Sequence, residues 1–153
     1  MKASHLITFL LAIALLLGTL WYAFVRTDEA VAPTDGAPQL TYQNASADLI
    51  MVELPYPGAV VGKQFSVIGQ ARGYWFFEAS FPVEVIDANG VRLAVGIAQA
   101  EDEWMTEDFV PFRADLTIPN SFIGPATLVL HKDNPSGLPE HDASLSFPIT
   151  VEY

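Results

Sequence analysis

Residues 77–97 read FEASFPVEVIDANGVRLAVGI, and this stretch decides the fold. Apolar residues alternate with others on both sides of Asn89-Gly90. A period of two is typical of strands with one buried face, and Asn-Gly between two such runs predicts a tight hairpin. The residues predicted to share a face are Phe77, Ala79, Phe81, Val83 and Val85 in the first strand, and Val91, Leu93, Val95 and Ile97 in the second.

The same alternation extends outward from this hairpin in both directions. Five further segments show it, at residues 49–54, 65–71, 110–118, 126–130 and 145–153. Seven short strands punctuated by Gly, Pro and Asn are typical of an immunoglobulin-like fold. We therefore predict an all-β domain, an immunoglobulin-like β-sandwich of about seven strands, with a small barrel as the alternative architecture.

Composition limits both the fold and the function of this chain. It has 153 residues, no Cys, and 18 acidic residues against 7 basic ones, for a net charge of -11. Without Cys the core rests on packing alone, and disulfides, thiolate metal sites and a cysteine nucleophile are excluded. Nucleic acid is not an expected partner, because phosphate binding needs clustered Lys and Arg.

An uncharged apolar run lies close to the N-terminus. Residues 6–25 read LITFLLAIALLLGTLWYAFV, and a helix of that length spans roughly 30 Å, the thickness of a bilayer core. A cleaved signal peptide is the alternative, but Ala30-Val31-Ala32 lies well beyond the apolar run. We expect residues 1–26 to be an uncleaved signal-anchor, a single pass through the cytoplasmic membrane.

The segment between this anchor and the strands has a different composition. Residues 27–47 are rich in Ala, Pro, Thr and Asp, with no periodicity, which predicts a flexible linker. The domain itself is then expected at residues 48–153, outside the cytoplasm. All 18 acidic residues follow residue 26, so the exported part carries an acidic surface that disfavours anionic partners.

Three stretches break the alternation and are the candidate binding segments. Residues 73–79 hold four aromatics followed by a carboxylate, residues 101–109 hold five carboxylates around a Trp-Met pair, and residues 132–140 are rich in turn formers. Each also has a purely structural interpretation, as core filling, solvated connection and specified turn respectively. The candidate binding residues are Trp75, Glu78, Trp104, Met105, Asp133, Asn134, Pro135, Ser136 and Gly137.

Sequence signatures of catalysis and metal binding are missing from the chain. It has no G-x-S-x-G, S-x-x-K, H-E-x-x-H or phosphate-binding Gly loop. The acidic stretch lacks the Asp/Asn spacing and central Gly of a calcium loop. We therefore expect no catalytic residue, no metal and no cofactor.

A series of short motifs runs through residues 48–153 in order. They are Pro-Tyr-Pro-Gly at 55–58, Gly-Gln-Ala-Arg-Gly at 69–73, Trp-Phe-Phe-Glu-Ala at 75–79, Phe-Pro-Val at 81–83, Asp87, Asn-Gly at 89–90, Trp-Met at 104–105, Phe-Val-Pro-Phe at 109–112 and Asp-Asn-Pro-Ser-Gly-Leu-Pro at 133–139. This series resembles the bacterial spore-germination-associated immunoglobulin-like domain, the second of the GerMN-associated domains. The resemblance implies an immunoglobulin-like fold on an exported bacterial protein and supplies no catalytic residues.

Together these features predict a non-catalytic recognition module that binds another protein at the bacterial cell envelope through loops or a sheet edge. The alternative is a carbohydrate-binding module for cell-wall glycan, with Tyr74, Trp75 or Trp104 as stacking faces. Exposed tryptophans would favour the glycan, and buried tryptophans with an exposed strand edge would favour the protein. The oligomeric state is not predicted.

Overall fold

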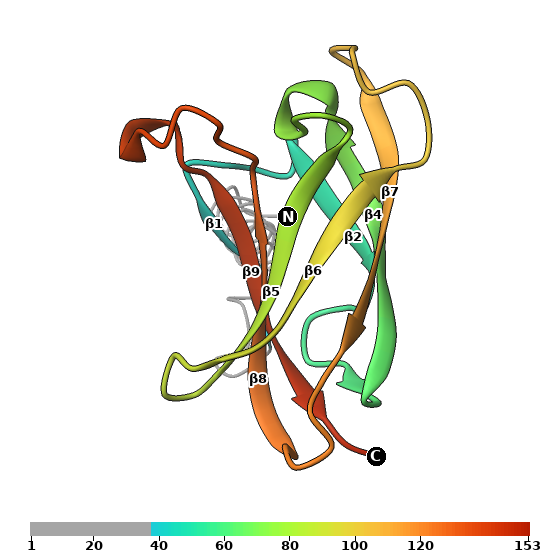
Figure 1. Cartoon of the computed structure of the whole chain (residues 1–153), viewed down its shortest axis with the longest axis vertical. Helices are drawn as coiled ribbons and strands as arrows, with labels where there is room; N and C mark the ends of the chain where they lie inside the picture. The colour runs from blue at the N-terminus through green and yellow to red at the C-terminus, as the bar shows by residue number, and fades with distance from the viewer. Residues whose placement is uncertain (1–37) are drawn as a thin grey trace, which may run out of the picture. The chain divides into compact units, whose positions relative to one another are not determined.

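The computed structural model describes residues 38–153 (Figure 1). The predicted anchor and the first part of the predicted linker, up to residue 37, lie outside the described residues. In the part that is described, no helix combines the length and the apolar character needed to cross a membrane.

Nine strands and two short 3-10 turns make up the compact unit Pro38–Tyr153. The strands are β1 (Thr41–Gln43), β2 (Ile50–Leu54), β3 (Val60–Val61), β4 (Gln64–Arg72), β5 (Ser80–Asp87), β6 (Arg92–Ala100), β7 (Phe109–Thr117), β8 (Gly124–His131) and β9 (Ser144–Val151); the turns are η1 (Gly73–Trp75) and η2 (Pro139–His141). The all-β prediction is confirmed. Each of the seven predicted segments contains a strand, and the two additional strands are the short β1 and β3.

The strands form one curled sheet whose two halves face each other across the core (Figure 1). The order is β1-β9-β8-β5-β6-β7-β4-β2, with β3 beside β9, and every ladder is antiparallel except β3–β9. The halves join through two residue pairs of β6 and β7, Gln99–Arg113 and Ala100–Phe112. The arrangement therefore combines the facing layers of a sandwich with a single continuous sheet.

One segment closes both ends of this sheet. β2 pairs with β4 at one end, and the chain then crosses to the other end, where β3 runs parallel to β9. Pro55, which follows a cis peptide bond, and Pro57 lie in the crossing. Proline has no N–H to donate to a ladder, so these residues end β2 and free the chain to change layers.

Aromatic rings at right angles fill the centre of the core. Phe81 packs edge-on against Phe112, with ring centroids 4.9 Å apart, and against Trp75, with centroids 6.4 Å apart. All three side chains are fully buried. Such T-shaped contacts add about 0.5–1.5 kcal/mol beyond the area that they bury. Core packing thus provides the stability that disulfides provide in other small domains.

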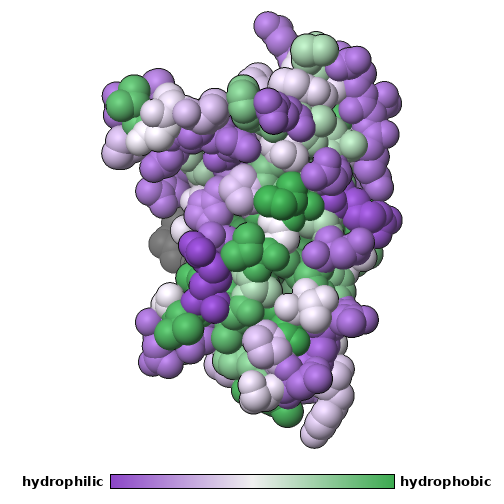
Figure 2. All heavy atoms as spheres, in the orientation of Figure 1, coloured by the Kyte–Doolittle hydropathy of each residue, from purple (hydrophilic) through white to green (hydrophobic). Residues whose placement is uncertain are grey.

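The predicted buried face of β6 is wrong except at Leu93, which is partly buried against the core. Val95 and Ile97 are 52% and 50% exposed, and Val91 is exposed as well. The inner face instead carries Gly96, where a Cβ would lie 2.7 Å from Leu116 Cδ2 of β7. The two layers approach so closely at Gly96 that only small residues fit between them, which leaves Val95 and Ile97 outside. Figure 2 shows hydrophobic side chains gathered over the middle of the outer surface that faces the viewer.

The predicted start of β5 is also wrong. Phe77 is exposed, and Glu78 and Ala79 have φ angles of 48° and 61°, in the left-handed region. Phe77 and Ser80 exchange backbone hydrogen bonds of 3.0 and 3.1 Å, which closes a tight turn. The alternation therefore begins only after this turn, at Ser80.

The end of the predicted linker belongs to the fold. β1 pairs with the first half of β9, with Thr41 opposite Ser146 and Gln43 opposite Ser144. Tyr42 packs against the core, and its burial raises the pKa of the phenol. Unpaired strand edges are costly to leave open, and β1 covers one. The compact unit accordingly begins at Pro38 rather than at Asp48.

Candidate functional site

The three stretches that break the alternation meet at one end of the sheet, which we call the loop end (Figure 1). It comprises residues 73–80, 101–108 and 132–143. The η1 turn lies between the other two loops and is bonded to both. Gly73 N donates to Asp108 O at 3.2 Å, and Asp133 N donates to Trp75 O at 3.0 Å. Sequence reasoning identified the three segments separately, and the fold brings them together.

Gly73 holds the acidic loop in place. A Cβ at this position would overlap the carbonyl oxygens of Trp104 and Thr106, so only glycine permits the approach. Thr106 N donates to Trp104 O at 2.8 Å, and Met105 N donates to Glu103 Oε1 at 3.1 Å. These bonds form a tight turn with Met105 at its tip. Its side chain is 74% exposed.

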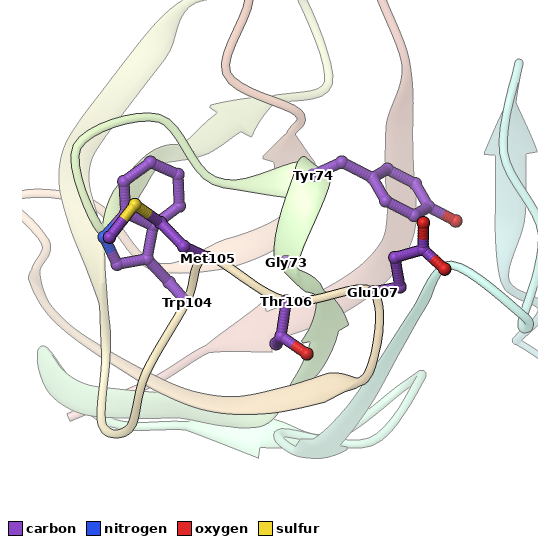
Figure 3. A pocket seen from close by; sticks show the side chains of 6 residues that line it. All are labelled: Gly73, Tyr74, Trp104, Met105, Thr106 and Glu107. Atoms are coloured by element: carbon purple, nitrogen blue, oxygen red, sulfur yellow. The ribbon is translucent and has the colours of Figure 1, made fainter.

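A shallow pocket of about 410 Å³ surrounds this contact. Its lining residues are Gly73, Tyr74, Trp104, Met105, Thr106 and Glu107 (Figure 3). Trp104 and Met105 project to one side of the Gly73–Thr106 contact, and Tyr74 and Glu107 project to the other (Figure 3). Trp104 is partly buried against the core, while Tyr74 is 51% exposed. The pocket thus presents apolar and aromatic surface with a single carboxylate.

The charges around this pocket are largely unpaired. Glu101 accepts from Arg113 at 3.2 Å. Arg72 lies 4.1 Å over the Phe109 ring and donates to two backbone carbonyl oxygens. Among residues 38–153, no cationic group lies within ion-pair distance of the other carboxylates of the loop, those of Asp102, Glu103, Glu107 and Asp108. The loop that supplies Trp104, Met105, Thr106 and Glu107 to the pocket therefore carries a net negative charge, and Glu107 is the carboxylate that lines the pocket itself.

Trp75 and Glu78 do not take part in this pocket. Trp75 is fully buried, which corrects its assignment as a binding face: it is a core residue. Glu78 is exposed, in the left-handed turn before β5. The aromatic run therefore divides, with Trp75 and Phe76 inside and Tyr74 and Phe77 outside.

The loop after β8 is held mainly by its own side chains. Asn134 Nδ2 donates to Leu138 O at 2.8 Å and to Asp142 Oδ1 at 2.7 Å, and the Ser136 hydroxyl bonds Asn134 Oδ1. Gly137 adopts a positive φ of 65°. The candidates Asp133, Asn134, Pro135, Ser136 and Gly137 therefore form a specified turn. A second hollow, of about 250 Å³, lies between this loop and Tyr74.

Ser136 and His141 are the one contact in this loop that resembles a catalytic pair. Ser136 Oγ lies 3.0 Å from His141 Nδ1, and both residues are exposed. No carboxylate of the described residues bonds the other imidazole nitrogen, so the third member of a triad is missing. In residues 38–153 there is also no group of three His, Asp or Glu side chains that could hold a metal ion.

Residues 49–137 match a protein family described as the immunoglobulin-like domain of bacterial spore germination, called Gmad2. The match covers more than half of the chain's 153 residues. The chain belongs to the Gmad2 family. The resemblance found in the motifs and the immunoglobulin-like fold are both confirmed. The Gmad2 match includes η1 and the acidic loop, and it ends within the loop after β8. No curated protein and no solved structure matches the chain.

Sequence reasoning missed the parts of the pocket that position the others. Gly73 was part of a quoted motif but was given no role, because its function depends on the backbone of a distant loop. Thr106 and Glu107 were hidden among the charges of the acidic stretch. A weak signal for Gly73 was present: it stands where the alternating run of residues 65–71 breaks off, and a glycine lets the backbone come close to another segment.

Proposed function

We propose that this chain is a non-catalytic recognition module that binds another protein at the bacterial cell envelope through its loop end. The observation that carries the proposal is the exposure of Met105 and Tyr74 around a pocket held by backbone contacts. Met and the aromatic residues are enriched in protein interfaces and depleted from ordinary surfaces. Membership of a spore-germination family supports a bacterial envelope setting.

The proposed location follows from the N-terminal run. Residues 6–25 are long and apolar enough to anchor the chain in the cytoplasmic membrane, with the Gmad2 domain outside the cytoplasm. The acidic surface of the domain then disfavours anionic partners and favours neutral or cationic ones.

A non-catalytic role is supported by the chemistry of the pocket. Hydrolysis of glycans requires two opposed carboxylates at a set distance, and Glu107 is the single carboxylate that lines this pocket. The Ser136–His141 contact lies in an exposed loop and serves the turn that contains it.

Cell-wall glycan is the second candidate ligand, and one observation favours it. Tyr74 is exposed and borders both hollows of the loop end, where its ring could stack on a sugar. The burial of Trp75 counts against this candidate because it removes one of the expected stacking faces. Co-sedimentation with isolated peptidoglycan separates the two: specific pelleting that Tyr74→Ala abolishes would favour the glycan.

The absence of Cys makes a direct test of the protein candidate straightforward. Met105→Cys in the full chain would carry a photoactivatable cross-linker in the bacterium that encodes it. The matched control is Ile123→Cys, which is also exposed but lies between β7 and β8 at the opposite end. We expect a discrete protein adduct from position 105 alone. Equal adducts from both positions, or none from position 105, would refute binding at the loop end.

A further inference from the structure

We propose that the pocket around Gly73 binds a cationic segment of the partner protein, in which Lys or Arg side chains flank an apolar one. This inference rests on the proposed function and specifies the chemistry of its partner. The structure supports it through the charge of the acidic loop, the apolar lining of the pocket and the rigidity of the loop, which are independent of one another.

The acidic loop selects for positive charge. Four carboxylates, those of Asp102, Glu103, Glu107 and Asp108, lie within the loop without an ion-pair partner among the described residues. Two cations contact this loop or its carboxylates, Arg113 through Glu101 and Arg72 through Glu107 O, so the five carboxylates of residues 101–108 keep the loop negative overall. Unpaired like charges on the loop that lines a hollow attract a cationic segment and repel an anionic one.

The residues that line the pocket also favour an apolar side chain in the ligand. Met105 and Trp104 present apolar surface on one side of the pocket, and a thioether adapts its shape to the group that it meets. The Tyr74 ring and the Glu107 carboxylate both project to the other side (Figure 3). An aromatic ring and a carboxylate that line one pocket suit an ammonium or guanidinium group, which is attracted to both. An apolar side chain flanked by cations would therefore use both sides.

The loop is arranged for binding in advance. The close contact at Gly73 and the bonds Thr106 N–Trp104 O and Met105 N–Glu103 Oε1 fix the backbone around the tip. A loop that is already ordered loses little conformational entropy when a ligand binds. Even a small pocket can therefore select a ligand.

A second exposed apolar surface, on β6, lacks this complementarity. On the outer face of β6, Val95 and Ile97 lie beside Glu84, whose charge is already balanced by Arg92 at 2.8 Å. The outer face of β6 therefore gives no indication of the charge of a partner that would bind there. The loop end is the surface on which both charge and apolar contact point to one kind of partner.

Methionine methyl groups give a direct readout of this site. The chain contains three methionines, so the full protein labelled with ¹³C-methyl Met in nanodiscs of uncharged lipid has few signals to resolve. Met105 reports the pocket, and Met51 on β2 serves as an internal control. The probes are the pentapeptides Lys-Lys-Leu-Lys-Lys, Lys-Lys-Ser-Lys-Lys and Glu-Glu-Leu-Glu-Glu, each also tested with empty nanodiscs.

We expect Lys-Lys-Leu-Lys-Lys to shift the Met105 methyl signal in a saturable way and to leave Met51 unchanged. The triple variant Glu103→Gln, Glu107→Gln, Asp108→Asn should weaken binding about tenfold, because three exposed charge contacts are lost. A matched variant, Glu53→Gln, Asp115→Asn, Glu152→Gln, removes as much charge elsewhere and should change affinity less than about twofold.

Several results would overturn the inference. Equal binding of the Leu and Ser peptides would show that charge alone attracts them, and equal weakening by both triple variants would show that the charge of the whole domain does so. No shift of Met105 would refute the pocket. The cross-linking test is independent: a protein adduct at position 105 without peptide binding would retain the proposed function and reject this partner chemistry.

Discussion

At the scale of single residues, Trp75 has two properties that bear on its role. Its indole N–H is buried without a hydrogen-bond partner among the described residues, and its ring packs edge-on against Phe81. An unpaired buried donor costs stability, whereas the buried ring contributes it. The side chain is therefore retained for its volume, which is the behaviour of a core residue rather than of a ligand-binding one.

This balance predicts a clear difference between two variants. Trp75→Phe removes the unpaired N–H and keeps an aromatic ring, so it should cost less than about 1.5 kcal/mol of unfolding free energy. Trp75→Ala opens a cavity beside Phe81 and should cost about 3–5 kcal/mol. Urea unfolding of both variants measures the difference. Similar costs for the two would mean that the indole nitrogen contributes a contact of its own.

Asp87 carries a residue-scale prediction about pH. Its Oδ1 accepts hydrogen bonds from the backbone N–H groups of Val91 and Asn89, both at 2.8 Å. These bonds, led by that from Val91, hold the pKa of the carboxyl below its ordinary value of 3.8. A depressed pKa means that the carboxylate stabilises the turn at and above pH 3.8, and that this contribution is lost as the pH falls through the depressed value.

An NMR titration of the Asp87 carboxyl carbon measures this pKa. We expect a midpoint below 3.8, and we expect Asp87→Asn to abolish the acid-induced loosening of the hairpin turn. A midpoint at or above the ordinary value would show that the two backbone bonds do not form in solution.

At the scale of elements, the sequence predicted strand positions well and strand faces unevenly. In β5, Phe81, Val83 and Val85 face inward as predicted, because large apolar residues there alternate with polar ones. In β6 both alternating sets are apolar, small on one side and large on the other. Which set is buried depends on how closely β7 approaches, and that distance is not encoded locally. The pocket was unpredictable for the same reason, since Gly73 acts on a loop about thirty residues away.

The reversed face of β6 predicts that two large apolar residues contribute little to stability. The double variant Val95→Thr, Ile97→Thr keeps β-branched side chains on an exposed face and should change the unfolding free energy by less than about 0.5 kcal/mol. Val83→Thr on the inner face of the neighbouring strand should cost about 1–3 kcal/mol, because it buries a hydroxyl. Thermal and urea unfolding compare them. A large loss of unfolding free energy in the double variant would show that Val95 and Ile97 are core residues.

At the scale of the whole molecule, the fold depends on segments that its alternating strands do not reveal. β1 and β3 are short, yet they cover the two halves of the β9 edge, β1 beside Ser144 and Ser146 and β3 beside Thr150 and Val151. Short edge segments carry too few residues to show a period. The sequence boundary at Asp48 therefore omitted β1, a strand that pairs within the folded unit.

Removing β1 tests this boundary. A fragment of residues 48–153 should be less stable than one of residues 38–153 by about 2 kcal/mol, because it loses the β1 ladder and the packing of Tyr42. Its open β9 edge should also promote self-association. Urea unfolding and sedimentation velocity measure both effects, and hydrogen exchange should quicken in the first half of β9 alone. Equal stability of the two fragments would show that β1 is dispensable.

The direction of β1 connects the edge of the sheet to the loop end. β1 runs antiparallel to β9, and β9 begins at the loop end, so the chain enters the folded unit travelling toward the three loops. Asn44, the residue directly after β1, donates to Asp142 O at 2.9 Å in the loop after β8. The segment that completes the β9 edge therefore also holds one of the three loops, and a fragment that lacks it would lose a support of the loop end together with the β1 ladder.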